Sequence, residues 1–345
     1  MTRLPITEIL PPIWQRVLQC SSVAPQDNFF ENGGTLWLAD TLFAELAQAC
    51  GREFPSAMIC HAPTIASLAA LLDAPSLPRF SPFVQTKPGN KEPPIFIAPG
   101  LEGSVRTFQL ARLIRTEHPI FSIQAKGIDG LEEPLDRVED MAEYYLQALK
   151  EMQPHGPYFL IGYSFGGLVT LEMAHRLTQR GEQIALLALL DTYPHLSFLP
   201  LGMRLRVLAQ RAGNHVSAMR QLPLRDVCSY VALELKRRLL PGSRLPAVPG
   251  PQPPRLSFAR TTVYAKQKAF LALARYQPRF YPGNVKFVRA EIVSHFPDDP
   301  AAIWARMSES FELETIPGGH LDMLTTHAQD LAHVLTRYLS ETFSE

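Results

Sequence analysis

The residue best placed to do chemistry is a serine held between two glycines, in the pattern G-x-S-x-G at 162–166. The apolar run 158–161 comes before this pattern, and an apolar helical pattern follows at 167–180. A sharp turn from strand to helix needs small residues on both sides of the serine, and it places the hydroxyl above the sheet at a helix N-terminus. This context favours a nucleophilic role for Ser164 over an incidental serine in a glycine-rich turn.

A serine hydroxyl is a poor nucleophile until a base removes its proton and a carboxylate orients that base. Of the ten histidines, His320 lies in the segment IPGGHLDM, just beyond the apolar run 311–316 that is expected to be the last strand. By contrast, His175 falls in the middle of an expected helix, and others lie in turns that follow no strand. We therefore expect His320 to be the base.

The carboxylate that orients this base has two candidate positions. Asp191 ends the apolar run 185–190, whereas Asp298 and Asp299 follow the next such run, 285–293. Functional groups of α/β proteins gather at the carboxyl ends of strands, and both positions keep the chain order Ser, Asp, His. Spacing favours Asp191 but leaves the choice open.

Attack on a carbonyl creates an oxyanion, which needs two fixed backbone donors. One should be the N–H of Phe165, the residue after the serine. The other should come from the loop APGLEGS, residues 98–104, where glycines let the backbone approach closely, and our candidate is the N–H of Leu101. A simple glycine-rich connection is the competing interpretation of this loop.

Short apolar runs alternate with helical patterns over the larger part of the chain, which predicts a parallel sheet with crossover helices. Residues 196–275 interrupt this alternation with helical stretches and six prolines between 241 and 254, so we expect an inserted lid there. The expected strands are 95–98, 119–123, 158–161, 185–190, 285–293 and 311–316, and the last helix is expected near 327–343.

The first 75 residues form a separate small domain in this interpretation. Three helical patterns there predict a bundle of three to four helices, the first starting after Pro12. The next residues, 76–92, are rich in proline and show little periodicity, which is typical of a linker. The remaining residues, 93–345, would make up the larger domain.

Composition excludes several classes of function. Basic and acidic residues both number 33, so the chain lacks the basic field that non-specific nucleic-acid binding requires. The longest apolar run, 184–190, is far too short for a membrane span. The four cysteines show no metal-binding spacing, which predicts a reduced, cytoplasmic protein without a structural metal.

Five separated motifs then carry a resemblance to a known family. They are PPIFIAPGLEGSV, FSIQAKGIDGLEEPLDRVEDMAEYYLQAL, GPYFLIGYSFGGLVTLEMAHRL, ALLDTYP and IPGGHLDML. Together they resemble, over about 93–340, the type I thioesterase domain that closes nonribosomal peptide and polyketide assembly lines. The resemblance implies an α/β-hydrolase fold with a helical lid insertion, and it raises Asp191 well above Asp298 and Asp299.

The resemblance implies transfer of an acyl or peptidyl chain from a carrier thioester to Ser164, then release to water. No metal, nucleotide or redox cofactor is expected in this chemistry. An acyltransferase or cyclase, which passes the chain to an amine or alcohol, is the enzymatic alternative. A non-catalytic module that docks carriers is the alternative from another class, and a generic carboxylesterase is weaker because it would not need a carrier-like domain.

The first domain resembles an acyl or peptidyl carrier domain in the segments VAPQDNFFENGG and PTIASLA. Such carriers continue Gly-Gly-Asp-Ser-Leu, and the serine accepts the phosphopantetheine arm. Here Leu36 stands where that serine should be, and an alkyl side chain cannot form a phosphodiester. Thr35 would serve only after a slip of one residue that misplaces the apolar face of the helix. We expect a degenerate carrier domain that binds no phosphopantetheine.

The acyl group must then arrive from another carrier protein in trans or from coenzyme A. Residues 199–260 contain eleven basic and two acidic residues, whereas residues 1–75 contain three basic and seven acidic. A basic lid is able to attract an incoming acidic carrier or to hold the chain's own first domain. Solvated arginines on amphipathic helices are the competing interpretation.

Overall fold

The computed structural model describes residues 5–74, 80–101, 103–220, 257–293, 296–297 and 299–344. The expected lid residues 221–256 lie outside this part of the chain, as does Asp298. Among the residues that are described, no helix combines the length and the apolar character that crossing a membrane would take.

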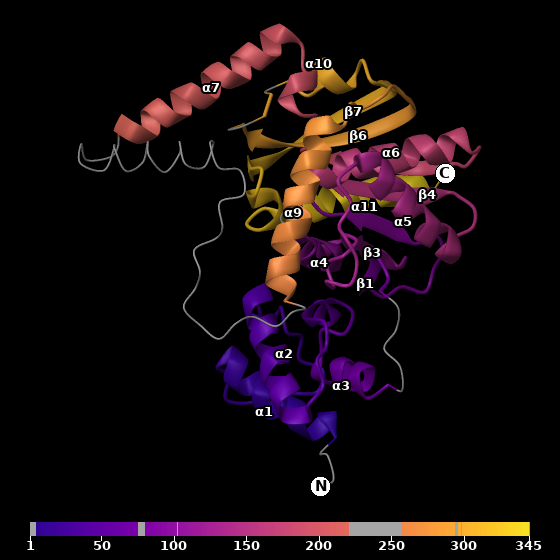
Figure 1. The fold of residues 1–345 in the computed structure, drawn as a ribbon. Helices are drawn as coiled ribbons and strands as arrows, with labels where there is room; N and C mark the ends of the chain where they lie inside the picture. The colour runs from indigo at the N-terminus through magenta and orange to yellow at the C-terminus, as the bar shows by residue number, and fades with distance from the viewer. Residues whose placement is uncertain are drawn as a thin grey trace.

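The N-terminal residues fold into a helical bundle around their own core, at the bottom of Figure 1. Trp14, Phe29 and Phe43 are fully or almost fully buried there, and the rings of Trp14 and Phe29 meet edge to face at 5.2 Å. The elements of this bundle are α1 (Ile6–Leu18), α2 (Leu36–Cys50), η1 (Ser56–Cys60) and α3 (Ile65–Asp73).

The first helix begins earlier than its prolines predicted. Pro11 and Pro12 lie inside α1, which starts at Ile6. A proline in a helix interior costs about 3 kcal/mol because it removes a backbone hydrogen bond. Ile6 and Leu10 nevertheless lie on the same face as Ile13, and all three are buried in the bundle, so their burial outweighs the two prolines.

Seven strands form one sheet in the order β1-β3-β2-β4-β5-β6-β7. All neighbours pair in parallel except β1, which pairs with β3 in the antiparallel direction at the edge. The strands are β1 (Phe83–Lys87), β2 (Ile95–Ala98), β3 (Ile120–Ile123), β4 (Tyr158–Tyr163), β5 (Ile184–Leu190), β6 (Tyr281–Ile292) and β7 (Ser308–Gly319).

The edge strand β1 corrects the expected linker 76–92, because it lies inside that range and belongs to the sheet. Phe83 and Val84 are buried, and this short apolar pair gives the strand a reason to dock. The surrounding prolines hid it from pattern analysis, since prolines are tolerated at edge strands but typical of linkers. The link between the two domains is therefore shorter than expected.

Helices cover both faces of the sheet, so the parallel strands are buried as their continuous apolar runs require (Figure 1). One face is covered by α5 (Val138–Met152) and α6 (Phe165–Gln179), and the other by α4 (Val105–Leu113) and α11 (Ala328–Ser344). The expected α/β architecture is confirmed, with the three candidate residues just after β4, β5 and β7.

Helices also follow β5, where the lid insertion was expected. The short η2 (Leu196–Phe198) leads into α7 (Leu201–Arg220), and α9 (Phe258–Arg275) precedes β6. In Figure 1, α9 runs from the N-terminal bundle to the upper part of the larger domain. A helix of 18 residues spans about 27 Å at 1.5 Å per residue.

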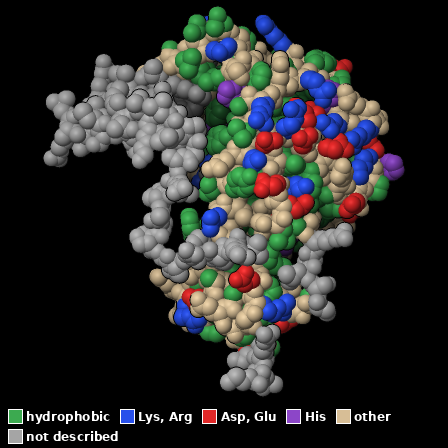
Figure 2. Space-filling view, in the orientation of Figure 1, with side chains coloured by type: hydrophobic (Ala, Val, Ile, Leu, Met, Phe, Trp, Pro, Cys, Tyr) green, Lys and Arg blue, Asp and Glu red, His purple; other side chains and the backbone are tan. Residues whose placement is uncertain are grey.

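A buried carboxylate fixes the far end of α9. Glu172 on α6 is 1% exposed and accepts hydrogen bonds from Arg176 (2.9 Å), Arg279 (3.0 Å) and Tyr276 (3.1 Å), the residue that follows α9. Burial raises the pKa of Glu172, but the hydrogen bonds and charges of the two arginines outweigh it and leave the pKa lowered. On the surface of the larger domain, basic and acidic side chains are intermixed, as the right-hand side of Figure 2 shows.

Replacing Glu172 should show how its contribution to the stability of the fold depends on pH. We expect Glu172→Gln to lower the free energy of unfolding by about 2 kcal/mol at neutral pH, since charge-assisted hydrogen bonds from Arg176 and Arg279 to a buried carboxylate are weakened. A carboxylate with a lowered pKa stabilises the fold above its ordinary pKa and stops doing so as pH falls through the folded-state pKa. The difference from wild type, measured by urea unfolding, should therefore shrink below about pH 4.5.

Glu151→Gln, at an exposed position of α5, is the matched control and should change stability little at any pH. A Glu172→Gln deficit that stays constant down to acidic pH would contradict this interpretation.

Candidate active site

The turn between β4 and α6 holds Ser164 in a strained conformation, with φ 54° and ψ −120°. Its backbone N–H donates to the carbonyl of Leu190 at 2.8 Å, which ties the turn to the end of β5. A Cβ at Gly162 would overlap Thr170, and one at Gly166 would overlap the carbonyl of Pro99. The two glycines of the motif are therefore required by close packing, which leaves the serine at the tip of the turn.

The structure brings Ser164 and His320 together, although they are far apart in the sequence. The Nε2 atom of His320 lies 3.0 Å from the Oγ of Ser164, and its Nδ1 atom lies 2.7 Å from the Oδ2 of Asp191. A carboxylate can only accept, so a hydrogen on Nδ1 satisfies Asp191 and leaves Nε2 free to accept from the serine hydroxyl. This arrangement is able to draw the proton from Ser164.

Asp191 is the carboxylate that contacts the histidine, whereas Asp299, the later candidate that the structure describes, makes a different contact. It follows β5 with φ 44°, its side chain is 5% exposed, and its Oδ1 accepts the N–H of Ala290 at 3.3 Å. Asp299 instead lies just before a short helix, α10 (Ala301–Trp304), and accepts the N–H of Ala302 at 3.2 Å. Among the described candidates, the geometry therefore favours Asp191, and Asp298 lies outside the described residues.

Two aromatic residues that the sequence analysis missed hold the histidine in place. The hydroxyl of Tyr163 donates to the carbonyl of His320 at 2.6 Å, and the two rings stack with centroids 4.9 Å apart. The centroid of the Phe296 ring lies 4.8 Å from that of the His320 ring, and the two rings are tilted relative to each other. Tyr163 was visible as the residue between Gly162 and the serine, but nothing in the sequence marked Phe296.

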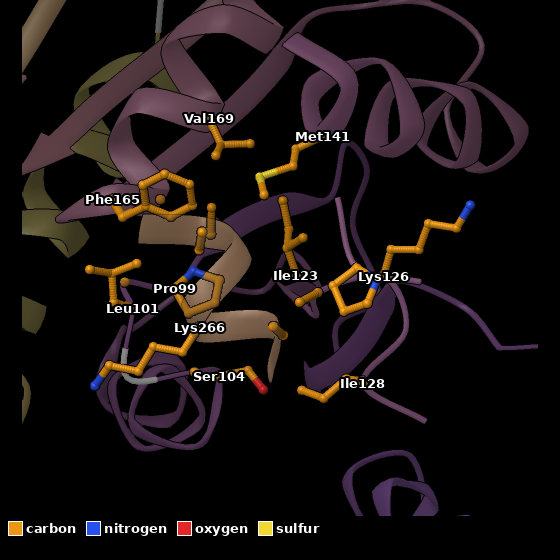
Figure 3. A pocket seen from close by; sticks show the side chains of 18 of the residues that line it. Pro99, Leu101, Ser104, Ile123, Lys126, Ile128, Met141, Phe165, Val169 and Lys266 are labelled. Carbon is orange, nitrogen blue, oxygen red and sulfur yellow. The ribbon is translucent and has the colours of Figure 1, made fainter. Parts of the chain in front are cut away.

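The loop after β2 runs beside the serine, as expected for a second oxyanion donor. A Cβ on Gly100 would lie 3.1 Å from the Cβ of Ser164, so the backbone passes as close as a glycine allows. Leu101 and Phe165 line one cavity next to this loop, and both are labelled in Figure 3. Phe165 follows Ser164 in the chain and Leu101 follows Gly100, so both remain the candidate oxyanion donors.

The cavity itself is mostly apolar. It extends from the loop after β2 under α9, which contributes Thr262, Ala265, Lys266 and Ala269 to its wall. Figure 3 shows Lys126 and Lys266 extending to opposite sides, with their nitrogen atoms away from the apolar middle. The middle is formed by Pro99, Ile123, Ile128, Met141, Phe165 and Val169.

The start of α2 can be compared with what a phosphopantetheine site needs. Leu36 is the first residue of the helix, and its side chain packs against the core of the bundle. The hydroxyl of Thr35 accepts the N–H of Leu38 at 3.2 Å, which is the usual role of a threonine at a helix N-cap. Thr35 is therefore the N-cap of α2, and Leu36 is its first residue.

Two known families match separate parts of the chain. Residues 93–210 match the thioesterase domain family, and residues 10–72 match the phosphopantetheine attachment site family. The chain is 32% identical over 308 residues to a dimodular nonribosomal peptide synthase of Bacillus subtilis (strain 168), covering 86% of this chain and 12% of that protein. It is 38% identical over 189 residues to an indigoidine synthase of Dickeya dadantii (strain 3937), covering 54% and 13%. The chain spans about an eighth of the length of these relatives.

Solved structures share the fold. A four-domain nonribosomal peptide synthetase bound to AMP and glycine aligns with a TM-score of 0.56 at 22% identity, over 98% of this chain and 26% of that one. The NocB thioesterase domain in covalent complex with a fluorophosphonate nocardicin G analogue aligns with a TM-score of 0.51 at 21% identity, over 72% and 95%. The chain therefore combines a domain of the phosphopantetheine-attachment family with a thioesterase domain of the serine-hydrolase class and the α/β-hydrolase fold.

Proposed function

We propose that this protein takes an acyl or peptidyl chain from a pantetheine thioester onto Ser164 and releases it by hydrolysis, in natural-product biosynthesis. The observation that carries the proposal is the position of His320, 3.0 Å from the serine hydroxyl and 2.7 Å from Asp191. The similarity to nonribosomal peptide synthetases supports the class of substrate.

In the proposed first step, His320 takes the hydroxyl proton while the serine oxygen attacks the thioester carbonyl. The backbone N–H groups of Phe165 and Leu101 stabilise the oxyanion. The tetrahedral intermediate then collapses, the C–S bond breaks, and His320 returns the proton to the departing pantetheine thiolate. Asp191 keeps the imidazole oriented and stabilises its charged form throughout.

In the second step water attacks the acyl ester, and His320 acts again as base and then as acid. The products are the free acid and regenerated Ser164, so atoms and protons balance without a cofactor. The apolar cavity beside Phe165 is where we place the acyl chain.

We also propose that the N-terminal domain is a degenerate carrier, so the thioester arrives on a separate carrier protein in trans or on coenzyme A. The proposal is supported by Leu36, whose alkyl side chain offers no hydroxyl, and by Thr35, whose hydroxyl is used as a helix cap.

Intact-protein mass spectrometry tests the main proposal. Wild type and Ser164→Ala are mixed with a panel of acyl-pantetheine thioesters, and free acid is measured alongside. We expect added acyl mass on wild type alone, followed by its decay to free acid. An acyl-enzyme that persists without acid would contradict hydrolysis and favour transfer or cyclisation. If wild type gains no mass and forms no acid, the result would contradict catalytic activity and favour a non-catalytic docking module.

The role of Asp191 makes a second prediction. Asparagine can donate to Nδ1 and so hold the imidazole in the wrong tautomer, and we expect Asp191→Asn to lower kcat by about 10⁴-fold. Asp299→Asn, which changes an exposed side chain bound to the N–H of Ala302, should leave kcat within about twofold of wild type in the same steady-state assay. Similar losses in the two variants would refute the assignment.

The degenerate carrier makes a third prediction. Incubation with coenzyme A and a phosphopantetheinyl transferase should leave the mass of wild type unchanged, whereas Leu36→Ser should gain one phosphopantetheine arm. An intact carrier protein in the same mixture shows that the transferase is active. An arm on wild type, mapped to Thr35 by peptide analysis, would contradict the proposal.

A further inference from the structure

A buried carboxylate of the N-terminal domain binds the first turn of α9. Asp40 on α2 is 5% exposed and accepts hydrogen bonds from the hydroxyl of Ser257 (2.6 Å) and the N–H groups of Phe258 (2.6 Å) and Ala259 (3.1 Å). The hydroxyl of Ser56, also in the N-terminal domain, donates to the same carboxylate. A charged acceptor at a helix N-terminus satisfies free N–H groups and complements the helix dipole.

The same turn is anchored by packing. Phe258 is 1% exposed and belongs to the core of the N-terminal bundle, although it is the first residue of α9. Ile128, which lines the acyl cavity, also belongs to that core. The hydroxyl of Thr261 donates to the carbonyl of Ile128, which connects the first turns of α9 to the cavity wall.

The helix α9 is therefore held at both ends and lines the cavity in between. Its first turn is fixed by Asp40, and the residue after its last turn, Tyr276, is fixed by Glu172 in the larger domain. Between the two anchors, one face of the helix carries Thr262, Ala265, Lys266 and Ala269, spaced at i, i+3, i+4 and i+7, into the cavity wall. Figure 1 shows α9 passing from one domain to the other.

We propose that the N-terminal domain is a fixed part of the acyl-binding site, and that Asp40 is a positioning residue that holds α9 over the cavity. The proposal rests on the proposed function, because it assigns the cavity to the acyl chain. It gives the domain a role that needs no phosphopantetheine: its position sets the shape of the cavity wall and thereby the selection of acyl chains.

The proposal distinguishes short from long substrates. An acetyl group ends near Ser164, whereas a decanoyl chain must run along the wall that α9 provides. Loosening α9 should therefore weaken binding of the long chain and leave chemistry at Ser164 intact. A purely structural role for Asp40 would affect both substrates alike.

The test compares full-length wild type, Asp40→Asn and Glu45→Gln on acetyl- and decanoyl-pantetheine thioesters, at a temperature where melting curves show all three folded. Glu45 is the matched control, since it also lies on α2 but pairs with Arg16 on α1 at 2.7 Å. For Asp40→Asn we expect kcat/KM of the decanoyl substrate to fall about tenfold through KM, or about 1.4 kcal/mol. Turnover of the acetyl substrate by Asp40→Asn, and of both substrates by Glu45→Gln, should stay within about twofold of wild type.

If Asp40→Asn does not fold, Ser257→Ala is the second variant. It removes one of the three donors at the start of α9, and it should lower kcat/KM of the decanoyl substrate relative to the acetyl substrate as well.

Hydrogen exchange supplies a readout that does not depend on turnover. We expect the amides of residues 258–269 to exchange faster in Asp40→Asn while those of α6 remain protected. Wild type that hydrolyses neither thioester would refute the proposed function, and the exchange of α9 would then decide the present proposal by itself. Equal losses on both thioesters, or unchanged exchange in α9, would overturn it.

Discussion

The two hydrogen bonds of the His320 ring, to Ser164 and Asp191, are the constraint on which the site depends. They join residues that leave the sheet after three different strands, so they form only if the parallel register is kept. Tyr163 pairs with Leu190 across β4 and β5, and the next residues, Ser164 and Asp191, therefore leave the sheet side by side. Both have positive φ, a strained conformation that persists only where the surrounding structure fixes it.

The position of α9 depends on contacts with both domains. A single helix, α9, joins a buried carboxylate of the N-terminal bundle to a buried carboxylate of the larger domain, and it lines the cavity on the way. A carrier domain that delivers its own cargo must move between sites, whereas this domain contributes a helix cap and packing to its neighbour. The proposed degenerate carrier, with Leu36 in place of a serine, and the anchor at Asp40 are consistent with such a fixed role.

Sequence patterns predicted the elements with strong local signals. The glycine spacing around Ser164 predicted the turn, and strand ends predicted the neighbourhood of His320 and Asp191. Contacts between distant segments were not predictable: nothing local marks Phe296 as a partner of His320, or Asp40 as the cap of a helix more than 200 residues away. The prolines led to wrong predictions at α1 and β1. Proline indicates a helix start or a linker locally, but burial of Ile6 and Phe83 outweighed that preference.

Locating the covalent intermediate is the most direct test of Ser164 as the nucleophile. Wild type is quenched in acid during turnover of an acyl-pantetheine thioester, digested with protease and mapped by tandem mass spectrometry. We expect an acyl ester on Ser164 alone, with a lifetime that lengthens when Asp191 is replaced by asparagine. An acyl group on another residue, or turnover that leaves Ser164 unmodified at every quench time and in the Asp191→Asn variant, would contradict it.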